Sequence, residues 1–292
     1  MKIKLTTLFV MILLIFSFNK INYYSHIFIF IKNEFTDFVF GSDKVKFIKT
    51  DQIISHAGGA IQGFIYTNSL QALDYNYSKG SRFFEIDIRR TKDNQYVGVH
   101  DWNEWVEMTG FNGELPPTLG EFKKQKIYKK FTPLDMNAIN SWFDNHSDAV
   151  LVTDKIDNPL DFIPKFKFRN RLIMELFSIE SIEKGLTAGI GVMASWSAFE
   201  NMNDEKKISL VKNMKIKYLS VPNGVVYSNP SLLRKLSSFS KIYSYGSYKI
   251  NGTKEFGHKT ETYVLCKESE YFYGVYVDHF FYNAKKINCN EF

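Results

Sequence analysis

The sequence predicts an α/β protein of the TIM type, a (β/α)8 barrel preceded by an N-terminal hydrophobic anchor helix. Short apolar runs alternate with more polar segments of helix length from about residue 50 to the end of the chain. The apolar runs number about eight over roughly 240 residues, which fits a closed barrel better than an open parallel sheet. At the N-terminus, the basic "MKIK" leads into the uncharged run Leu5–Phe18.

The N-terminal run is shorter than the roughly 20 residues that cross a membrane, and it suits the core of a signal peptide. No small-residue cleavage site follows, however, and the apolar patch His26–Ile31 extends the segment. We therefore predict an uncleaved signal-anchor over residues 1–31, a juxtamembrane linker over 32–49 and a barrel over 50–292. A cleaved signal peptide and a buried soluble helix are the alternatives.

The charges beside the anchor predict its orientation. Lys2 and Lys4 favour a cytoplasmic N-terminus. The barrel would then lie outside the cytoplasm, in the periplasm or on the cell surface, or be secreted if the segment is cleaved.

The composition, 45% hydrophobic and 23% charged, excludes a chain that is disordered in bulk. The net charge of +6 lies in lysine-rich clusters such as Glu121–Lys130. Because no nucleic-acid-binding module accompanies these clusters, we interpret them as solvated faces and expect no nucleic-acid partner. Cys266 and Cys289 are the only cysteines, and their spacing excludes a structural zinc site while leaving open whether they pair.

The first predicted elements carry most of the candidate chemistry. A strand over Gln52–Gly59 ends in a glycine turn and carries His56. A helix over Thr67–Gly80 follows, with Thr67 or Asn68 as its cap and Gly80 as its end.

Two further strands come next, over Arg82–Arg89 and Gln95–His100. In the first, Glu85 and Asp87 share a face because strand side chains alternate with a period of two. In the second, His100 emerges at the end of the strand. The remaining strands are predicted at 149–156, 171–177, 191–197, 216–222, 241–250 and 273–280, with helices at 136–148, 178–189, 203–214 and 229–239.

In a barrel, functional side chains gather at the carboxyl ends of the strands. Glu85 and Asp87 would meet Asp154, which ends the strand over 149–156. Three buried carboxylates repel one another unless a cation lies between them, and oxygen ligands suit Mg²⁺ or Ca²⁺ rather than zinc. The alternative is a salt-bridge network with the cations Arg82, Arg89, Arg90 or Lys155. The strand-end histidines His56 and His100 favour the metal.

Four stretches carry a family resemblance: "HAGG", "TNSLQAL", "EIDIRRTKDNQYVGVHD" and "VTDKI". They resemble the glycerophosphodiester phosphodiesterase family, which shows His-Arg-Gly, Glu-Asn, Glu-x-Asp, His-Asp and a carboxylate near a lysine. The resemblance runs from about Ser55 to Phe280 and is most specific between Glu85 and Asp101. It implies a TIM barrel that hydrolyses phosphodiesters with one divalent cation, Mg²⁺ or Ca²⁺, and a pair of histidines.

The resemblance also implies roles for individual residues. Glu85, Asp87 and Asp154 would be metal ligands, and His56 and His100 the acid–base pair. The sequence departs from the family pattern at Ala57, where the family has a phosphate-holding arginine, and at Thr67, where it has glutamate. Loss of the arginine removes a bidentate phosphate clamp. Lys155 is the expected phosphate contact, with Arg89 or Arg90 as alternatives. Independently of the resemblance, the place of Trp196 at a strand end makes it a candidate substrate contact, with burial in the core as the alternative.

These observations predict a metal-dependent phosphoric diester hydrolase. Its substrate would be a small phosphodiester, such as a deacylated phospholipid headgroup, or a glycan bearing glycerol phosphate. A phospholipase D-like or lyase activity that forms a cyclic phosphate is an alternative, and Ala57 motivates another, a catalytically weak barrel that binds phosphorylated glycans or lipids. Glu175 is held in reserve as a metal or substrate contact, and Asp278 and His279 as substrate contacts.

Overall fold

The computed structural model describes residues 45–246, 248–250, 253–255, 258–279 and 286–289. The predicted anchor over 1–31 and residues 32–44 of the predicted linker lie outside these ranges. Within them, no helix combines the length and the apolar character needed to cross a membrane. Val45–Phe292 form one compact unit.

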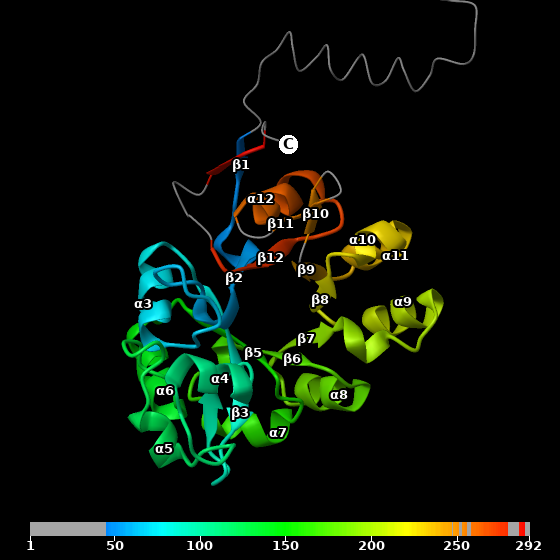
Figure 1. Cartoon of the computed structure of the whole chain (residues 1–292). Helices are drawn as coiled ribbons and strands as arrows, with labels where there is room; N and C mark the ends of the chain where they lie inside the picture. Colours follow the sequence, from blue (N-terminus) through cyan, green and yellow to red (C-terminus); the bar gives the residue numbers. More distant parts are fainter. Residues whose placement is uncertain (1–44, 247, 251–252, 256–257, 280–285, 290–292) are drawn as a thin grey trace, which may run out of the picture. The chain divides into compact units, whose positions relative to one another are not determined.

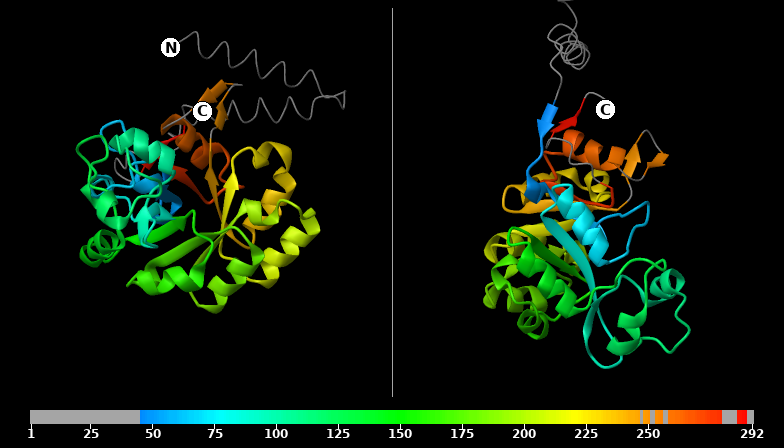
Figure 2. Two further views of the ribbon diagram at one scale, coloured as in Figure 1. Left: turned by 60° about the horizontal axis from the view of Figure 1, so that its bottom comes forward. Right: turned by 90° about the vertical axis from the view of Figure 1, so that its left-hand side faces the viewer.

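The centre of this unit is a closed barrel of parallel strands, which confirms the predicted TIM-type fold (Figures 1 and 2). Parallel pairing runs around the ring, and the pairs Ile54↔Phe83 and Val275↔Ile53 join the first strand to its two neighbours. The barrel strands, in ring order, are β2 (Ile53–Ser55), β3 (Phe83–Arg90), β5 (Val150–Asp154), β6 (Leu172–Leu176), β7 (Gly191–Ser195), β8 (Tyr218–Pro222), β9 (Lys241–Tyr245) and β12 (Gly274–Val277).

Helices surround the barrel (Figure 2). The main core is made of apolar side chains from both the barrel strands and these helices. A second, smaller apolar cluster is made of Ile54, Val152, Ile173, Met193 and Tyr243. The helices are α3 (Leu70–Ser78), α6 (Met136–Asn145), α7 (Pro159–Phe162), α8 (Ile179–Thr187), α9 (Asp204–Asn213), α10 (Val225–Ser228), α11 (Pro230–Ser237) and α12 (His258–Lys267). Short 3-10 helices are η1 (Thr50–Gln52), η2 (His56–Gly58), η3 (Ile163–Lys165), η4 (Arg169–Arg171) and η5 (Trp196–Phe199).

The predicted strand over 95–100 is not part of the parallel barrel. It is the short strand β4 (Tyr96–Gly98), which runs antiparallel to the end of β3 with Ile88 opposite Gly98. A tight turn closed by Thr91 N–H donating to Gln95 O joins the two strands. So short a connection permits only antiparallel pairing, because parallel strands need a crossover of a dozen or more residues. Beyond β4 lie α4 (Trp102–Thr109) and α5 (Leu119–Lys124) (Figure 1).

The C-terminal part contains two small antiparallel sheets. The predicted strand over 241–250 is divided, because β9 ends at Tyr245 and β10 (Tyr248–Ile250) pairs with β11 (Thr253–Glu255). β1 (Val45–Phe47), within the range predicted as linker, pairs with β13 (Lys286–Asn288). A disulfide joins Cys266 in α12 to Cys289 after β13, which answers the question of their pairing.

Candidate active site

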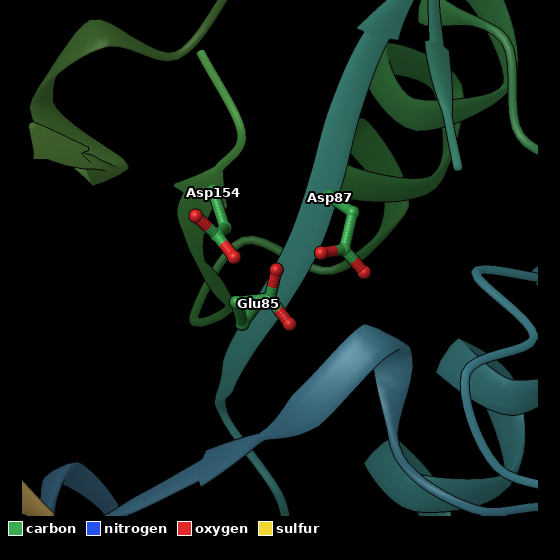
Figure 3. A group of neighbouring side chains, drawn as sticks. All are labelled: Glu85, Asp87 and Asp154. Atoms are coloured by element: carbon green, nitrogen blue, oxygen red, sulfur yellow. The ribbon is translucent and has the colours of Figure 1, made fainter. Parts of the chain in front are cut away.

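Three carboxyl groups meet at the carboxyl ends of neighbouring barrel strands (Figure 3). Glu85 and Asp87 project from β3, and Asp154 ends β5, where it lies opposite Asp87 in the parallel register. One oxygen from each can be chosen so that all three lie within 4.8 Å of one another. The structure therefore brings together the three residues predicted as metal ligands, which we call the carboxylate trio.

Burial makes this trio electrostatically costly. Glu85 is 1% exposed and Asp87 0%. One oxygen of each is hydrogen-bonded: Ala57 N–H donates to Glu85 Oε2 at 2.6 Å, and Asn68 Nδ2 donates to Asp87 Oδ2 at 2.9 Å. The other oxygens, Glu85 Oε1 and Asp87 Oδ1, are buried without a hydrogen-bond partner in the described part of the chain.

The pKa values of both carboxyl groups respond to this environment. Burial, then the charges of Asp87 and Asp154, raises the pKa of Glu85 well above its ordinary value. Burial and the charge of Asp154 likewise raise the pKa of Asp87. A hard divalent cation would satisfy two buried oxygens that lack hydrogen bonds within the described ranges and would offset the mutual repulsion of the carboxylates, so the donor set fits Mg²⁺ or Ca²⁺.

Asn68 orients Asp87 through two contacts. Its Nδ2 donates to the carboxylate, and its Oδ1 accepts the Asp87 backbone N–H at 3.1 Å. The prediction that Thr67 or Asn68 caps the following helix is wrong, because the Ser69 side chain caps α3 by accepting from Ala72 N–H. Asn68 adopts φ 42°, a left-handed conformation that asparagine tolerates better than most residues and that here accompanies these side-chain contacts.

Ala57, at the position of the family's arginine, contributes through its backbone. It adopts φ 48° and is fully buried, with its N–H directed to Glu85 and its carbonyl accepting from Asn68 N–H at 3.1 Å. A methyl group there cannot hold a phosphate. The backbone N–H of Ala57 instead orients the carboxylate of Glu85.

Lys155 is the cation that reaches the trio. Its Nζ lies 2.6 Å from Asp154 Oδ2 and 3.7 Å from Asp87 Oδ1. Burial lowers the pKa of Lys155, but the charge and hydrogen bond of Asp154 outweigh burial and raise it, so the amine stays protonated. One ammonium against three carboxylates still leaves negative charge for a cation to balance.

The arginines considered as alternatives are engaged elsewhere. Arg82 pairs with Asp148 at 2.6 Å, and Arg90 with Asp161. Arg89 Nε donates to the backbone carbonyl of His100 at 3.0 Å. In the described residues, therefore, a salt-bridge network around the trio involves Lys155 and not these arginines.

Each predicted catalytic histidine is paired with a carboxylate through Nδ1. His56 lies 3.1 Å from Asp278 Oδ1, and His100 lies 2.7 Å from Glu104 Oε2. Burial lowers the pKa of His56, but the hydrogen bond and charge of Asp278 outweigh it and raise the pKa. Each Nδ1 therefore faces a carboxylate oxygen, an arrangement that suits an N–H at Nδ1 because a carboxylate oxygen accepts hydrogen bonds.

Tyr66 connects the two histidines and was missed by the sequence reasoning. Its ring centroid lies 4.6 Å from that of His56 and 4.8 Å from that of His100. Burial, followed by the charges of Asp278 and Asp87, raises the pKa of Tyr66 to about 12. In the sequence, only its position directly before Thr67 and Asn68, two residues of the family resemblance, could have indicated Tyr66. No pattern of charge or hydrophobic periodicity includes it.

The remaining candidates lie around the same end of the barrel. Both oxygens of Glu175 are occupied, by Ser220 Oγ at 2.5 Å and Tyr276 OH at 2.8 Å. Burial, then the charge of Asp154, raises the pKa of Glu175 to about 7. Trp196 begins η5 directly after β7, and Lys207 Nζ lies 4.9 Å from its ring centroid. Contact of Trp196 with substrate stays a prediction.

Comparison with solved structures identifies several with the same fold. A glycerophosphoryl diester phosphodiesterase from Parabacteroides distasonis is 15% identical, with a TM-score of 0.61 over 84% of this chain and 86% of that one. The Thermotoga maritima glycerophosphodiester phosphodiesterase is 17% identical, with a TM-score of 0.59 over 78% and 94%. An Oleispira antarctica phosphodiesterase, solved with the product sn-glycerol-3-phosphate, is 14% identical, with a TM-score of 0.56 over 78% and 92%.

No family model matches the chain, and no curated protein matches it. At these identities, the solved structures establish the fold that the chain shares with them.

Proposed function

We propose that this protein is a metal-dependent phosphodiesterase of the glycerophosphodiester type. The observation that carries the proposal is a pair of buried oxygens without hydrogen-bond partners among the described residues, on Glu85 and Asp87, in a site that also holds two carboxylate-paired histidines. A binding module needs no such acid–base pair. The shared fold and the sn-glycerol-3-phosphate product of the Oleispira enzyme support a small glycerol-phosphate diester as the substrate class.

The carboxylate trio would hold one divalent cation, Mg²⁺ or Ca²⁺. Such an ion supplies a positive charge that binds a phosphate oxygen and offsets negative charge in the transition state. Before a substrate binds, the ammonium group of Lys155 limits the mutual repulsion of Asp87 and Asp154. When a substrate is bound, this ammonium group can instead contact the phosphate. It would then supply the positive charge of the arginine that the resembled family has at the position of Ala57.

The two histidines would divide the proton transfers between them. One imidazole takes a proton from the attacking hydroxyl at Nε2, and the other donates one to the departing alkoxide. In both rings the carboxylate partner at Nδ1 sets the ring orientation, and at His56 it also stabilises the imidazolium form. Tyr66 packs against both rings and limits their rotation, and Trp196 is proposed to contact the alcohol portion of the substrate.

We further propose that the barrel works outside the cytoplasm, tethered by residues 1–31. The Cys266–Cys289 disulfide supports this placement, since disulfides persist in oxidising compartments.

The test is turnover by the purified full chain in detergent, with glycerophosphocholine and related diesters, followed by ³¹P NMR. We expect release of a phosphomonoester in the presence of Mg²⁺ or Ca²⁺ and none after EDTA. His56→Ala and His100→Ala should each lower kcat by at least about 10²-fold with the fold intact. A cyclic phosphate product would support the lyase alternative, and binding without turnover would support the binding barrel. Full activity in either variant, or in EDTA, would refute the assignment.

A further inference from the structure

A buried glutamate lies behind the carboxylate that pairs with His56. Glu261, in the first turn of α12, is 4% exposed, and its Oε1 accepts the backbone N–H of Asp278 at 3.2 Å. Glu261 Oε2 is buried and has no hydrogen-bond partner in the part of the chain that the structure describes. Nothing in the proposed mechanism uses this residue.

The contact fixes the backbone from which the Asp278 side chain projects. On the other side of the same residue, the Asp278 carbonyl accepts the backbone N–H of Ala60 at 2.7 Å. Asp278 is therefore held from α12 through its N–H and from the loop after η2 through its C=O. With both peptide groups fixed, its carboxylate is directed to His56 Nδ1, 3.1 Å away.

The protonation equilibrium of Glu261 is compatible with its contact to the Asp278 backbone. Burial and the charge of Asp278 raise the pKa of Glu261 well above its ordinary value, while the backbone N–H groups of Asp278 and His279 act in the opposite direction. A neutral carboxyl group still accepts the Asp278 N–H through its carbonyl oxygen. The raised pKa favours this neutral form, which adds no second negative charge beside Asp278.

We propose that Glu261 is a positioning residue, which acts through Asp278 to hold His56 in its catalytic orientation and tautomer. This inference rests on the proposed function, in which His56 transfers a proton. It connects α12, which the disulfide ties to the C-terminal segment, with a residue of the acid–base pair.

The test uses the full chain in detergent, labelled with ¹⁵N-histidine. The chain has 6 histidines, so the His56 resonances can be assigned from a His56→Asn variant. Glu261→Met keeps the side-chain length but removes the acceptor, and Glu261→Gln keeps an acceptor oxygen. The matched control is Glu268→Met, since Glu268 is 5% exposed near the other end of α12 and its carboxylate accepts from Asn223 and Tyr227.

We expect Glu261→Met to shift the His56 Nδ1 resonance and weaken its downfield proton signal. With saturating cation and glycerophosphocholine, kcat should fall about tenfold or more while KM stays within about twofold, as for other residues that orient a reacting group. Glu261→Gln should restore both readouts, and Glu268→Met should change neither. If Glu261→Met fails to fold, Glu261→Asp, which withdraws the acceptor by one methylene, should show the same loss.

Three results would overturn the inference. They are an unchanged His56 resonance in folded Glu261→Met or Glu261→Asp, unchanged kcat in the same variant, or equal effects from Glu268→Met. The NMR readout needs no turnover. A wild-type protein inactive on all diesters would therefore refute the proposed function while the link from Glu261 to His56 is still measured.

Discussion

The substitution Glu85→Gln replaces an ionisable carboxyl group of the carboxylate trio with a neutral amide and keeps an oxygen for the Ala57 N–H. At the 4.8 Å that bounds the separation of the ligand oxygens, two unit charges repel by about 3.5 kcal/mol at an effective dielectric constant of about 20. Glu85 takes part in two such pairs. Because the raised pKa of Glu85 relieves part of this repulsion, we expect roughly 2 kcal/mol of the cost to persist at neutral pH.

In EDTA, Glu85→Gln should therefore unfold at a higher temperature than the wild type. For a domain of this size, about 2 kcal/mol corresponds to about 4–8 °C in Tm. Added Ca²⁺ or Mg²⁺ should reverse the order, since a ligand at 100 times its Kd stabilises the wild type by about 2.7 kcal/mol and the variant lacks a ligand oxygen. Thermal melts followed by circular dichroism, with and without cation, measure both effects.

The pH dependence has a definite sign. The folded pKa of Glu85 is raised, so the folded metal-free protein binds the proton more tightly than the unfolded chain does. This contribution to stability is fully present below the unfolded pKa of about 4.3 and is lost as the pH rises towards the folded pKa. Glu85→Gln should flatten that decline in EDTA.

The matched control is Glu175→Gln, because Glu175 is also buried, at 7% exposure, but both its oxygens accept from hydroxyl groups. This variant should keep the wild-type response to cation. A Glu85→Gln protein less stable than the wild type in EDTA, or equally stabilised by cation, would show that the trio is not a repulsive metal site.

Three further outcomes follow from the same geometry. Lys155→Met should raise KM for a diester by about tenfold through loss of a charged phosphate contact of about 1.5 kcal/mol, and an unchanged KM would place the phosphate elsewhere. Tyr66→Leu should lower kcat more than Tyr66→Phe, because packing against the histidines needs the ring and not the hydroxyl; equal losses in steady-state assays would contradict this. Cys266→Ser should lower the free energy of unfolding by about 3 kcal/mol, given the 23-residue separation of the bonded cysteines, and urea titration that found no change would refute that contribution.

Much of the architecture followed from periodicity alone. The predicted runs between residues 149 and 239 agree with β5, β6, α8, β7, α9, β8 and α11, whose apolar residues are buried in the barrel or against it, whereas the short helices α7 and α10 were not predicted. The alternation of β3 also placed Glu85 and Asp87 on one face, where the structure has them. The strand over 95–100 was wrongly predicted as part of the parallel barrel, because an apolar run indicates burial but not the direction of strand pairing. The tight turn at Thr91–Gln95 determines that direction.

What the sequence by itself determined was local: which segments form strands and helices, which side chains share a face, and which residue types suit a cation and a proton transfer. The tertiary structure alone decided which of these groups meet. His56 and Asp278 are 222 residues apart along the chain, and closure of β12 against β2 makes them neighbours. Tyr66 and Asn68 likewise reach the site through left-handed backbone conformations that no periodicity encodes. The physical reason is that spacing along a strand fixes the direction of a side chain, whereas its partner depends on how distant strands close the barrel.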